Sequence, residues 1–301
     1  MALCGAGLAQ GQDTPVFSTD VKVVNVLATV RNKSGALAGN LSQDDFALSE
    51  DGRPQTIRYF ARESDLPLTL GLLVDTSGSQ RRVLDAERGA SVRFLDQVVR
   101  NNKDQVFLMQ FDSVVQIKQA LTSSVGKLDD ALAYVDTETM KQVQIRRGGG
   151  TLLYDAVATA SDDVMSKLKG RKAVIVLSDG VDFGSTLTVK EAVEAAQRAD
   201  TLVYAILYAD PGAYGPFGGG IDGRRVMERL AEETGGSSFE VSKKHPVDEM
   251  FAILQEELRN QYNMGYVSDK PVTISGFRTI QLTVKRKGLV VQARHQYWAQ
   301  R

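Results

Sequence analysis

The chain has 301 residues, with 36 lysines and arginines against 37 aspartates and glutamates, which gives a formal net charge of −1. This near balance argues against a nucleic-acid-binding protein, because such proteins need a surplus of cations facing the phosphates. Hydrophobic residues make up 43% and charged residues 24%, so a mainly disordered or fibrous chain is excluded. At about 150 residues per domain, the length favours two compact units.

The sequence contains few thiol and imidazole groups, and this limits the metal sites and catalytic residues that it can form. Cys4 is the only cysteine in the sequence, so neither an internal disulfide nor a cysteine-rich zinc site is possible. His245 and His295 are the only histidines, which argues against histidine-based zinc sites and most Ser-His-Asp triads. We assign neither histidine a role. Any metal ion is therefore expected to have oxygen ligands.

Residues 1–15 are expected to lie outside the folded domains. Met1–Gln12 is apolar and rich in small residues, with Gly7 and Ala9 placed as in a signal-peptidase site, but no basic segment precedes them. We interpret it as the end of an export signal whose true start lies upstream; a frayed terminus is the alternative. The sequence thus predicts a secreted, periplasmic or envelope protein. The remaining chain has no run of 18 apolar residues, so we expect no transmembrane segment there.

Residues 16–65 contain three predicted β-strands. Val21–Arg31 alternates apolar and polar residues with the period of a half-buried strand. Phe46–Ser49 and Thr56–Ala61 follow, separated by a turn at Glu50–Pro54, and Ser42–Asp45 precedes them as a single helical turn. Three strands are too few to form a stable sandwich alone.

Residues 66–262 alternate between strands and helices. Leu68–Val74 is a continuous apolar run, typical of a strand buried on both faces of a parallel sheet. In the helix after it, Ala86, Ala90, Phe94 and Val98 lie four apart on one face. Further strands are predicted at Val106–Phe111, Ala173–Leu177, Leu202–Leu207 and Ser238–Val241, with an edge hairpin through Val114–Ile117, and helices at Lys127–Tyr134, Leu153–Leu168, Val189–Arg198, Val226–Thr234 and Val247–Leu258. This alternation predicts an α/β domain with a doubly wound, mostly parallel sheet.

Residues 263–301 return to the period of a β-strand. The predicted strands are Thr279–Lys285 and, after a turn at Lys287 and Gly288, Leu289–Tyr297. We predict that three strands from each end of the chain form one small β-sandwich, in which Tyr297 and Trp298 pack, and that the α/β domain is inserted into it. Independent hairpins are the alternative, although isolated hairpins are only marginally stable in water.

Oxygen-bearing side chains follow two of the buried strands. Asp75, Ser77 and Ser79 come directly after Leu68–Val74, and Asp179 follows the strand that ends at Leu177. In open α/β sheets, ligands bind at the carboxyl ends of the strands where the strand order reverses. If the strand order is 3-2-1-4-5-6, the two aspartates approach each other from separate loops.

A glycine-rich loop adds a fifth oxygen donor. Arg147–Asp155 contains three consecutive glycines and delivers the Thr151 hydroxyl at the start of a helix. Two carboxylates and three hydroxyls, without histidine or thiolate, suit Mg²⁺ or Mn²⁺. Mg²⁺ takes six oxygens, and these loops supply about four or five, so one position stays open. We therefore expect the ion to bind an acidic group of a partner protein.

At this point the sequence resembles the von Willebrand factor type A (VWA) domain family. Asp75, Ser77 and Ser79 match its DxSxS signature, Thr151 stands where its second metal loop has a threonine, and Asp179 matches the aspartate of its third loop. The resemblance covers about Leu66–Tyr262. It implies a metal-ion-dependent adhesion site (MIDAS), with the hydroxyls as direct ligands and the aspartates binding directly or through water. It implies no catalysis.

The flanking segments are similar to those of bacterial envelope proteins with a VWA-related domain of acidobacterial type. The resemblance lies in Leu41–Phe46 and Glu50–Pro54, which precede the adhesion domain in that family. It implies export of the protein.

The same loop residues are also compatible with two functions that need no adhesion. Ser and Asp at helix starts often cap the helix and nothing more, which leaves a metal-free structural scaffold. A strand ending in Asp75 followed by Ser178-Asp179-Gly180 also resembles Mg²⁺-dependent phosphohydrolases of the haloacid dehalogenase type, with Asp75 as the nucleophile. Those enzymes normally have an aspartate as general acid where this chain has Ser77.

A long loop and two aspartates each have two interpretations. The loop Ala209–Gly223 is expected on the same face as the metal, where Tyr214 and Phe217 would contact the partner; a solvated connection is the alternative. Asp182 either supports the metal ligands or is simply solvated. Asp155 lies one turn into a helix, where a carboxylate is favourable in any case.

Overall fold

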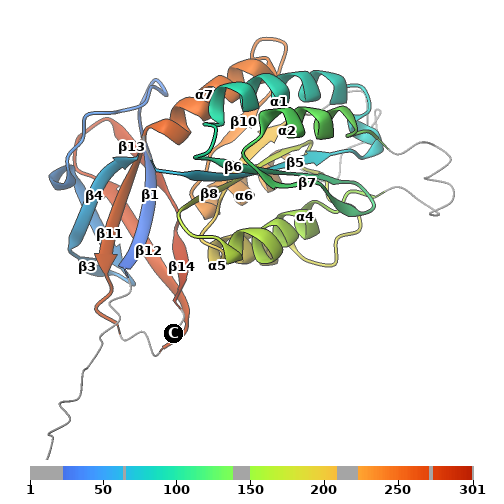
Figure 1. The fold of residues 1–301 in the computed structure, drawn as a ribbon. Helices are drawn as coiled ribbons and strands as arrows, with labels where there is room; N and C mark the ends of the chain where they lie inside the picture. Colours follow the sequence, from blue (N-terminus) through green and yellow to red (C-terminus); the bar gives the residue numbers. More distant parts are fainter. Residues whose placement is uncertain (1–22, 64–65, 138–149, 209–222, 271–273, 300–301) are drawn as a thin grey trace, which may run out of the picture.

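The computed structural model describes residues 23–63, 66–137, 150–208, 223–270 and 274–299 (Figure 1). Its strands are β1 (Val23–Asn32), β2 (Phe46–Glu50), β3 (Arg53–Gln55), β4 (Ile57–Glu63), β5 (Leu68–Asp75), β6 (Gln105–Phe111), β7 (Val115–Thr122), β8 (Arg171–Ser178), β9 (Leu202–Leu207), β10 (Ser238–Glu240), β11 (Gln261–Val267), β12 (Gly276–Val284), β13 (Leu289–Ala293) and β14 (Gln296–Ala299). Its α-helices are α1 (Leu84–Val98), α2 (Val125–Ala133), α4 (Leu153–Thr159), α5 (Val189–Arg198), α6 (Gly223–Thr234) and α7 (Val247–Arg259).

A six-stranded sheet forms the centre of the α/β domain. Its strand order is β10-β9-β8-β5-β6-β7, and all neighbours are parallel except β6 and β7. Numbered along the chain, this is the order 3-2-1-4-5-6, the condition under which the two aspartates approach each other, with β5 beside β8 where the order reverses. All residues of β8 and β9 are buried, as expected of strands covered on both faces. The predicted doubly wound sheet is confirmed.

Helices cover both faces of this sheet (Figure 1). On one face, α1, α2 and α7 pack their apolar stripes against alternate residues of the strands, such as Leu72 and Ile175. On the other face, α4, α5 and α6 cover the intervening residues, such as Leu73 and Val176. Each central strand therefore contributes to two cores. No helix within the described ranges is long and apolar enough to cross a bilayer.

Strands from both ends of the chain form a β-sandwich. Its two antiparallel sheets have the orders β13-β1-β11-β4 and β14-β12-β2-β3. The shared core includes Phe46, Phe60 and Tyr262, whose ring centroids lie 5.5 to 5.7 Å apart. The chain leaves the sandwich after β4 and returns in β11, where Glu63 pairs with Gln261. The predicted insertion of the α/β domain into a sandwich is confirmed.

The sandwich differs in detail from the prediction. β11 is not among the strands whose ranges are predicted from the sequence, although it pairs with both β1 and β4. The predicted strand Leu289–Tyr297 is divided at Arg294 and His295 into β13 and β14, which belong to different sheets. The interruption lets one stretch of chain pair with β1 in one sheet and β12 in the other.

Two helices also differ from the prediction. The helix expected at Leu153–Leu168 is an α-helix only as far as Thr159, and then continues as a π turn and a 3₁₀ turn. In α1, Ala86 is exposed and Glu87 is fully buried. The buried stripe follows Leu84, Glu87, Ser91 and Phe94, so a glutamate occupies a core position that the apolar pattern does not predict.

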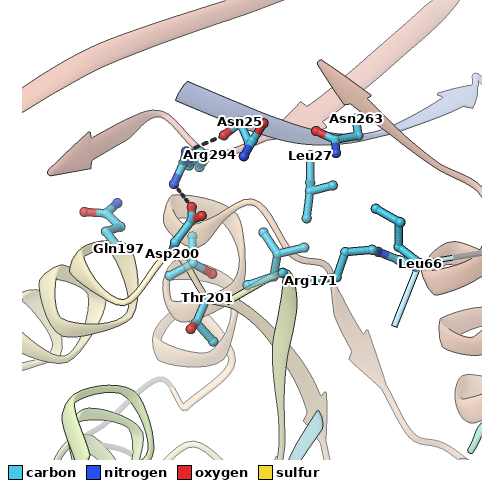
Figure 2. A pocket seen from close by; sticks show the side chains of 12 residues that line it. Asn25, Leu27, Leu66, Arg171, Gln197, Asp200, Thr201, Asn263 and Arg294 are labelled. Atoms are coloured by element: carbon cyan, nitrogen blue, oxygen red, sulfur yellow. Dashed lines mark hydrogen bonds and ion pairs between the residues drawn. The ribbon is translucent and has the colours of Figure 1, made fainter. Parts of the chain in front are cut away.

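Two arginines connect the sandwich to the α/β domain. Arg294 donates to the Asn25 carbonyl of β1 and to the Asp200 carboxylate, which lies before β9 (Figure 2). Arg31 of β1 pairs with the buried Glu257 of α7. A cavity of about 180 Å³ beside Arg294 is lined by both units. These contacts lie where the parallel strands begin, at the end of the sheet opposite to the loops that follow β5 and β8.

Candidate metal centre

Asp75 is the last residue of β5 and is fully buried. One carboxylate oxygen accepts a hydrogen bond from the Ser77 amide at 2.9 Å. The other accepts from the Ser178 hydroxyl, at the end of β8, at 2.6 Å. The two strands at the reversal point are thus joined through this side chain, and its orientation is set from both sides.

The two serines of the first loop lie together. Ser77 precedes the 3₁₀ turn Gly78–Gln80 in an extended conformation, and its hydroxyl oxygen is 3.0 Å from that of Ser79. Ser77 is 5% exposed, whereas Gly78 between them is exposed. The turn therefore brings both hydroxyls to one place near the protein surface.

Asp179 begins the loop after β8 and is 4% exposed. Its carboxylate accepts a hydrogen bond from the Val181 amide at 3.0 Å. Gly180, with φ +77°, follows it, and a Cβ on Gly180 would lie 2.2 Å from the Gly223 carbonyl oxygen at the start of α6. Only glycine fits this conformation and this approach without rearrangement. The close packing of the two glycines fixes the loop that carries Asp179.

Thr151 lies on a third loop, held by its backbone. It exchanges two backbone hydrogen bonds of 2.9 Å with Phe183, in the loop that carries Asp179. The next residue, Leu152, donates its amide to the Asp112 carbonyl after β6, also at 2.9 Å. Asp112 in turn accepts a hydrogen bond at 3.0 Å from the hydroxyl of Thr76, beside Asp75.

These contacts form a closed ring of loops around one place. Starting from β5, the ring passes through Thr76 and Asp112 to Thr151, then to the loop after β8, and returns through Ser178 to Asp75. The structure thus brings all three predicted loops together at one edge of the sheet. Thr76, Asp112 and Ser178 hold the ring and are not among the residues predicted from the sequence, although each stands at or just after a strand end.

Burial of the carboxyl groups and repulsion between them raise pKa values at the ring of loops. Burial, followed by the charge of Asp179, raises the pKa of Asp75 to about 7, although three hydrogen bonds oppose the shift. Burial and the charges of Asp75 and Asp179 also raise the pKa of Glu87, on α1, well above its usual value. Carboxylates that repel one another in a buried place favour the binding of a cation.

The donor set has the chemistry that a hard divalent cation requires. It consists of the two carboxylates of Asp75 and Asp179 and the hydroxyls of the serines and threonine on the same loops. Close by, the buried side chains of Gln80 and Glu87 lack hydrogen-bond partners in the described part of the chain. In the same part, no group of three His, Cys, Asp or Glu side chains is arranged to hold an ion, so hydroxyls are needed to complete the set. These residues fit Mg²⁺ or Mn²⁺.

Asp182 and Asp155 connect the loop after β8 to α4. Asp182 accepts hydrogen bonds from the Tyr154 amide at 3.1 Å and from the Ser185 hydroxyl at 2.6 Å. Asp155 accepts from the amides of Thr186 and Leu187. Both carboxylates are therefore committed to loop structure, and Asp182 is not merely solvated.

Some predicted features lie outside the described residues. Tyr214 and Phe217 are among them, as are residues 1–22 and the first part of the glycine-rich loop, residues 147–149. Contact between the partner and Tyr214 or Phe217 therefore stays a prediction.

The chain belongs to the von Willebrand factor type A domain family, whose sequence profile matches residues 70–252. This range begins in β5 and ends in α7, so it spans the six-stranded sheet and contains Asp75, Thr151 and Asp179. Domains of this family are typically binding modules with a MIDAS, and they are not usually enzymes. Comparison with curated proteins gave no match.

Several solved structures have a similar fold. BatB, a conserved hypothetical protein from Bacteroides thetaiotaomicron, is 16% identical, with a TM-score of 0.46 over 64% of this chain and 97% of that chain. The PilB minor pilin from Streptococcus sanguinis is 12% identical, with a TM-score of 0.47 over 65% and 62% of the two chains. Proximal thread matrix protein 1 from the mussel byssus, solved with zinc in its MIDAS motif, is 12% identical, with a TM-score of 0.51 over 69% and 49%. The similarity to the mussel protein supports the assignment of the fold and nothing further.

Proposed function

We propose that the protein is a binding module that uses a divalent cation to capture a protein partner through an acidic group. Asp75, Ser77, Ser79, Thr151 and Asp179 would hold Mg²⁺ or Mn²⁺. The observation that supports this most strongly is the closed ring of hydrogen bonds, which gathers three loops distant in sequence at one sheet edge.

The charges of the site support binding of an acidic partner. Two carboxylates balance the two positive charges of the ion, and the neutral hydroxyls donate little electron density to it. When bound, the ion would supply a positive centre that attracts an oxygen of the partner. The chain's own residues hold the donor set in place, because Ser178 and the Ser77 amide fix the Asp75 carboxylate. The zinc-occupied MIDAS motif of the mussel protein is consistent with this use of the fold.

We also infer that the protein acts outside the cytoplasm, in the bacterial envelope or beyond it. This rests on the apolar start of the sequence and on the likeness of Leu41–Phe46 and Glu50–Pro54 to acidobacterial-type VWA-related proteins. In this arrangement the sandwich would present the α/β domain to a partner.

Isothermal calorimetry with Mg²⁺ and Mn²⁺ tests the metal site. We expect one ion per chain for the wild type, and no binding for Asp75→Ala. Asp162→Ala is the matched control, because it removes an exposed carboxylate that pairs with Arg198 and belongs to none of the three loops; it should bind the ion as the wild type does. A wild-type protein that binds neither ion would refute the proposal in favour of a metal-free scaffold.

Capture from a bacterial envelope extract tests the partner. The immobilised wild-type protein should retain a specific protein in Mg²⁺ and release it in EDTA, whereas Asp75→Ala should retain none. Glutarate should compete with the captured protein, and its uncharged diamide should not. Hydrolysis of p-nitrophenyl phosphate by the wild type with Mg²⁺ would instead favour a phosphohydrolase with Asp75 as the nucleophile.

A further inference from the structure

Gln80 and Glu87 are among the fully buried polar side chains of helix α1 and the turn before it. Gln80 ends the 3₁₀ turn in the loop after β5, and Glu87 lies in the first turn of α1. Both are 0% exposed. Glu87 lies on the same face as Leu84 and Phe94, which pack in the core between α1 and the sheet.

Neither side chain has a partner that explains its burial. Both carboxylate oxygens of Glu87, and both the oxygen and the nitrogen of the Gln80 amide, lack hydrogen-bond partners among the described residues. Polar groups buried in proteins are almost always hydrogen-bonded, because leaving one unpaired destabilises the fold. A leucine at position 87 would continue the apolar stripe, so the fold alone does not account for a carboxylate here.

Glu87 lies close enough to the proposed metal ligands to be affected by their charges. Asp75 and Asp179 both raise its pKa, after the effect of burial. Nevertheless, no three acidic side chains in the described part of the chain are arranged to hold an ion jointly. Glu87 is therefore near the site, but it is not placed with the two aspartates as a third direct ligand.

We propose that Glu87 and Gln80 form the inner wall of the metal site and bind the divalent cation through water. The inference rests on the proposed function, since it assumes that the five oxygen donors hold an ion. Mg²⁺ keeps several of its waters when it binds to proteins, and their hydrogens need acceptors. The Glu87 carboxylate offers two acceptor atoms, and the Gln80 amide can both donate and accept. Carboxylates in such positions usually strengthen metal binding.

This role predicts two effects of opposite sign. Glu87→Gln keeps the shape of the side chain but removes its charge, so Mg²⁺ should bind about 10 to 100 times more weakly. In EDTA the same variant should be more stable than the wild type, because a buried unpaired carboxylate is replaced by a neutral group. A side chain needed only for the fold would lower the stability in EDTA when replaced.

The experiment combines Mg²⁺ calorimetry with urea unfolding in EDTA, on the full chain. Glu87→Leu is a second variant, which restores the apolar stripe and should show the same pair of effects. Glu257→Gln is the matched control. Glu257 is equally buried on a helix, but it pairs with Arg31 and Ser237. The control should lose stability and keep its affinity for Mg²⁺.

The outcomes separate this inference from the proposed function. If the wild type binds Mg²⁺ and both Glu87 variants bind it equally well, the inference is overturned and the metal site stands. Lower stability of both Glu87 variants in EDTA also overturns it, because the carboxylate would then serve the fold. If the wild type binds no Mg²⁺, the proposed function and this inference fail together.

Discussion

The carboxyl group of Asp75 is buried next to a second carboxylate, so its ionisation is unfavourable in the folded protein without a metal ion. Its pKa of about 7 lies well above the usual value of 3.8. The folded state therefore binds a proton more tightly than the unfolded state, and this stabilises the protein only at low pH. The stabilisation is lost as the pH rises from about 4 through 7.

Without metal, we therefore expect the free energy of unfolding to fall between pH 4 and pH 7, by up to about 4 kcal/mol from Asp75. Glu87, whose pKa is also raised, adds a change of the same sign. Urea unfolding in EDTA across this range measures the effect, and Asp75→Asn should remove the part that comes from Asp75. A wild type that gains stability with rising pH, in parallel with Asp75→Asn, would contradict this account.

Gly180 is the residue at which backbone conformation controls the site. Its φ is +77°, and a Cβ would lie 2.2 Å from the backbone of Gly223. We expect Gly180→Ala to move the Asp179 loop, to destabilise the protein by about 2–4 kcal/mol and to weaken Mg²⁺ binding, as measured by thermal unfolding and calorimetry.

Gly170→Ala is the matched control for this prediction. Gly170 has a φ of +90°, but nothing lies within 4 Å of a Cβ at that position. The free energy of unfolding of this variant should fall by only about 1 kcal/mol, because of backbone strain, and its affinity for Mg²⁺ should be unchanged. Equal losses in the two variants would show that the contact with Gly223 is unimportant.

At the scale of the elements, Glu50 connects the two sheets of the sandwich. Its carboxylate, on β2, accepts hydrogen bonds from Tyr266 on β11 at 2.7 Å and from Tyr297 on β14 at 2.9 Å. It also pairs with Arg278 on β12 at 3.3 Å. Because β11 belongs to one sheet and the other three strands to the second, this buried group fixes how the sheets face each other.

Removing the Glu50 carboxylate should destabilise the protein, because Arg278 would remain buried without its ion-pair partner. We expect Glu50→Ala to lower the free energy of unfolding by about 3–5 kcal/mol, measured in urea. Arg286→Ala breaks a more exposed ion pair with Asp45 in the same sandwich and should cost less than about 1 kcal/mol. Similar values for the two variants would refute a structural role for Glu50.

At the scale of the whole molecule, Arg294 connects the sandwich to the inserted domain. Its side chain is 9% exposed and binds both Asn25 and Asp200. Arg294→Ala should destabilise the protein by about 1–3 kcal/mol and separate one calorimetric unfolding transition into two. Arg198→Ala, which breaks an exposed pair with Asp162, should leave a single transition. Two transitions in the wild type itself would show that the units are independent.

Much of this architecture could be predicted from the sequence because the signals were local. Apolar runs such as Leu68–Val74 mark buried strands, and parallel strands place Asp75 and Asp179 at the same sheet edge. β11 also had a signal, the alternation of Tyr262, Met264 and Tyr266, but it follows α7 without a glycine or proline to separate the two.

The remaining features depend on tertiary contacts. The role of Ser178 follows from the pairing of β5 with β8, which places its hydroxyl under Asp75. Glu87 contradicts the expectation that core positions are apolar, so the helical pattern predicts Ala86 on the buried face instead. The division at Arg294 and His295 has no turn residue to mark it. The structure at these residues depends on the residues that pack around them, which the local sequence does not reveal.

The route of the chain through the sandwich determines how the molecule would respond to pulling. β1 and β11 form six antiparallel pairs, from Val23 opposite Val267 to Ala28 opposite Tyr262. The inserted domain is attached next to Tyr262, at the far end of this ladder from Val23. Tension applied between Val23 and the inserted domain would load all six pairs together in shear, and would not open them one by one. Such a geometry makes this ladder resistant to mechanical unfolding.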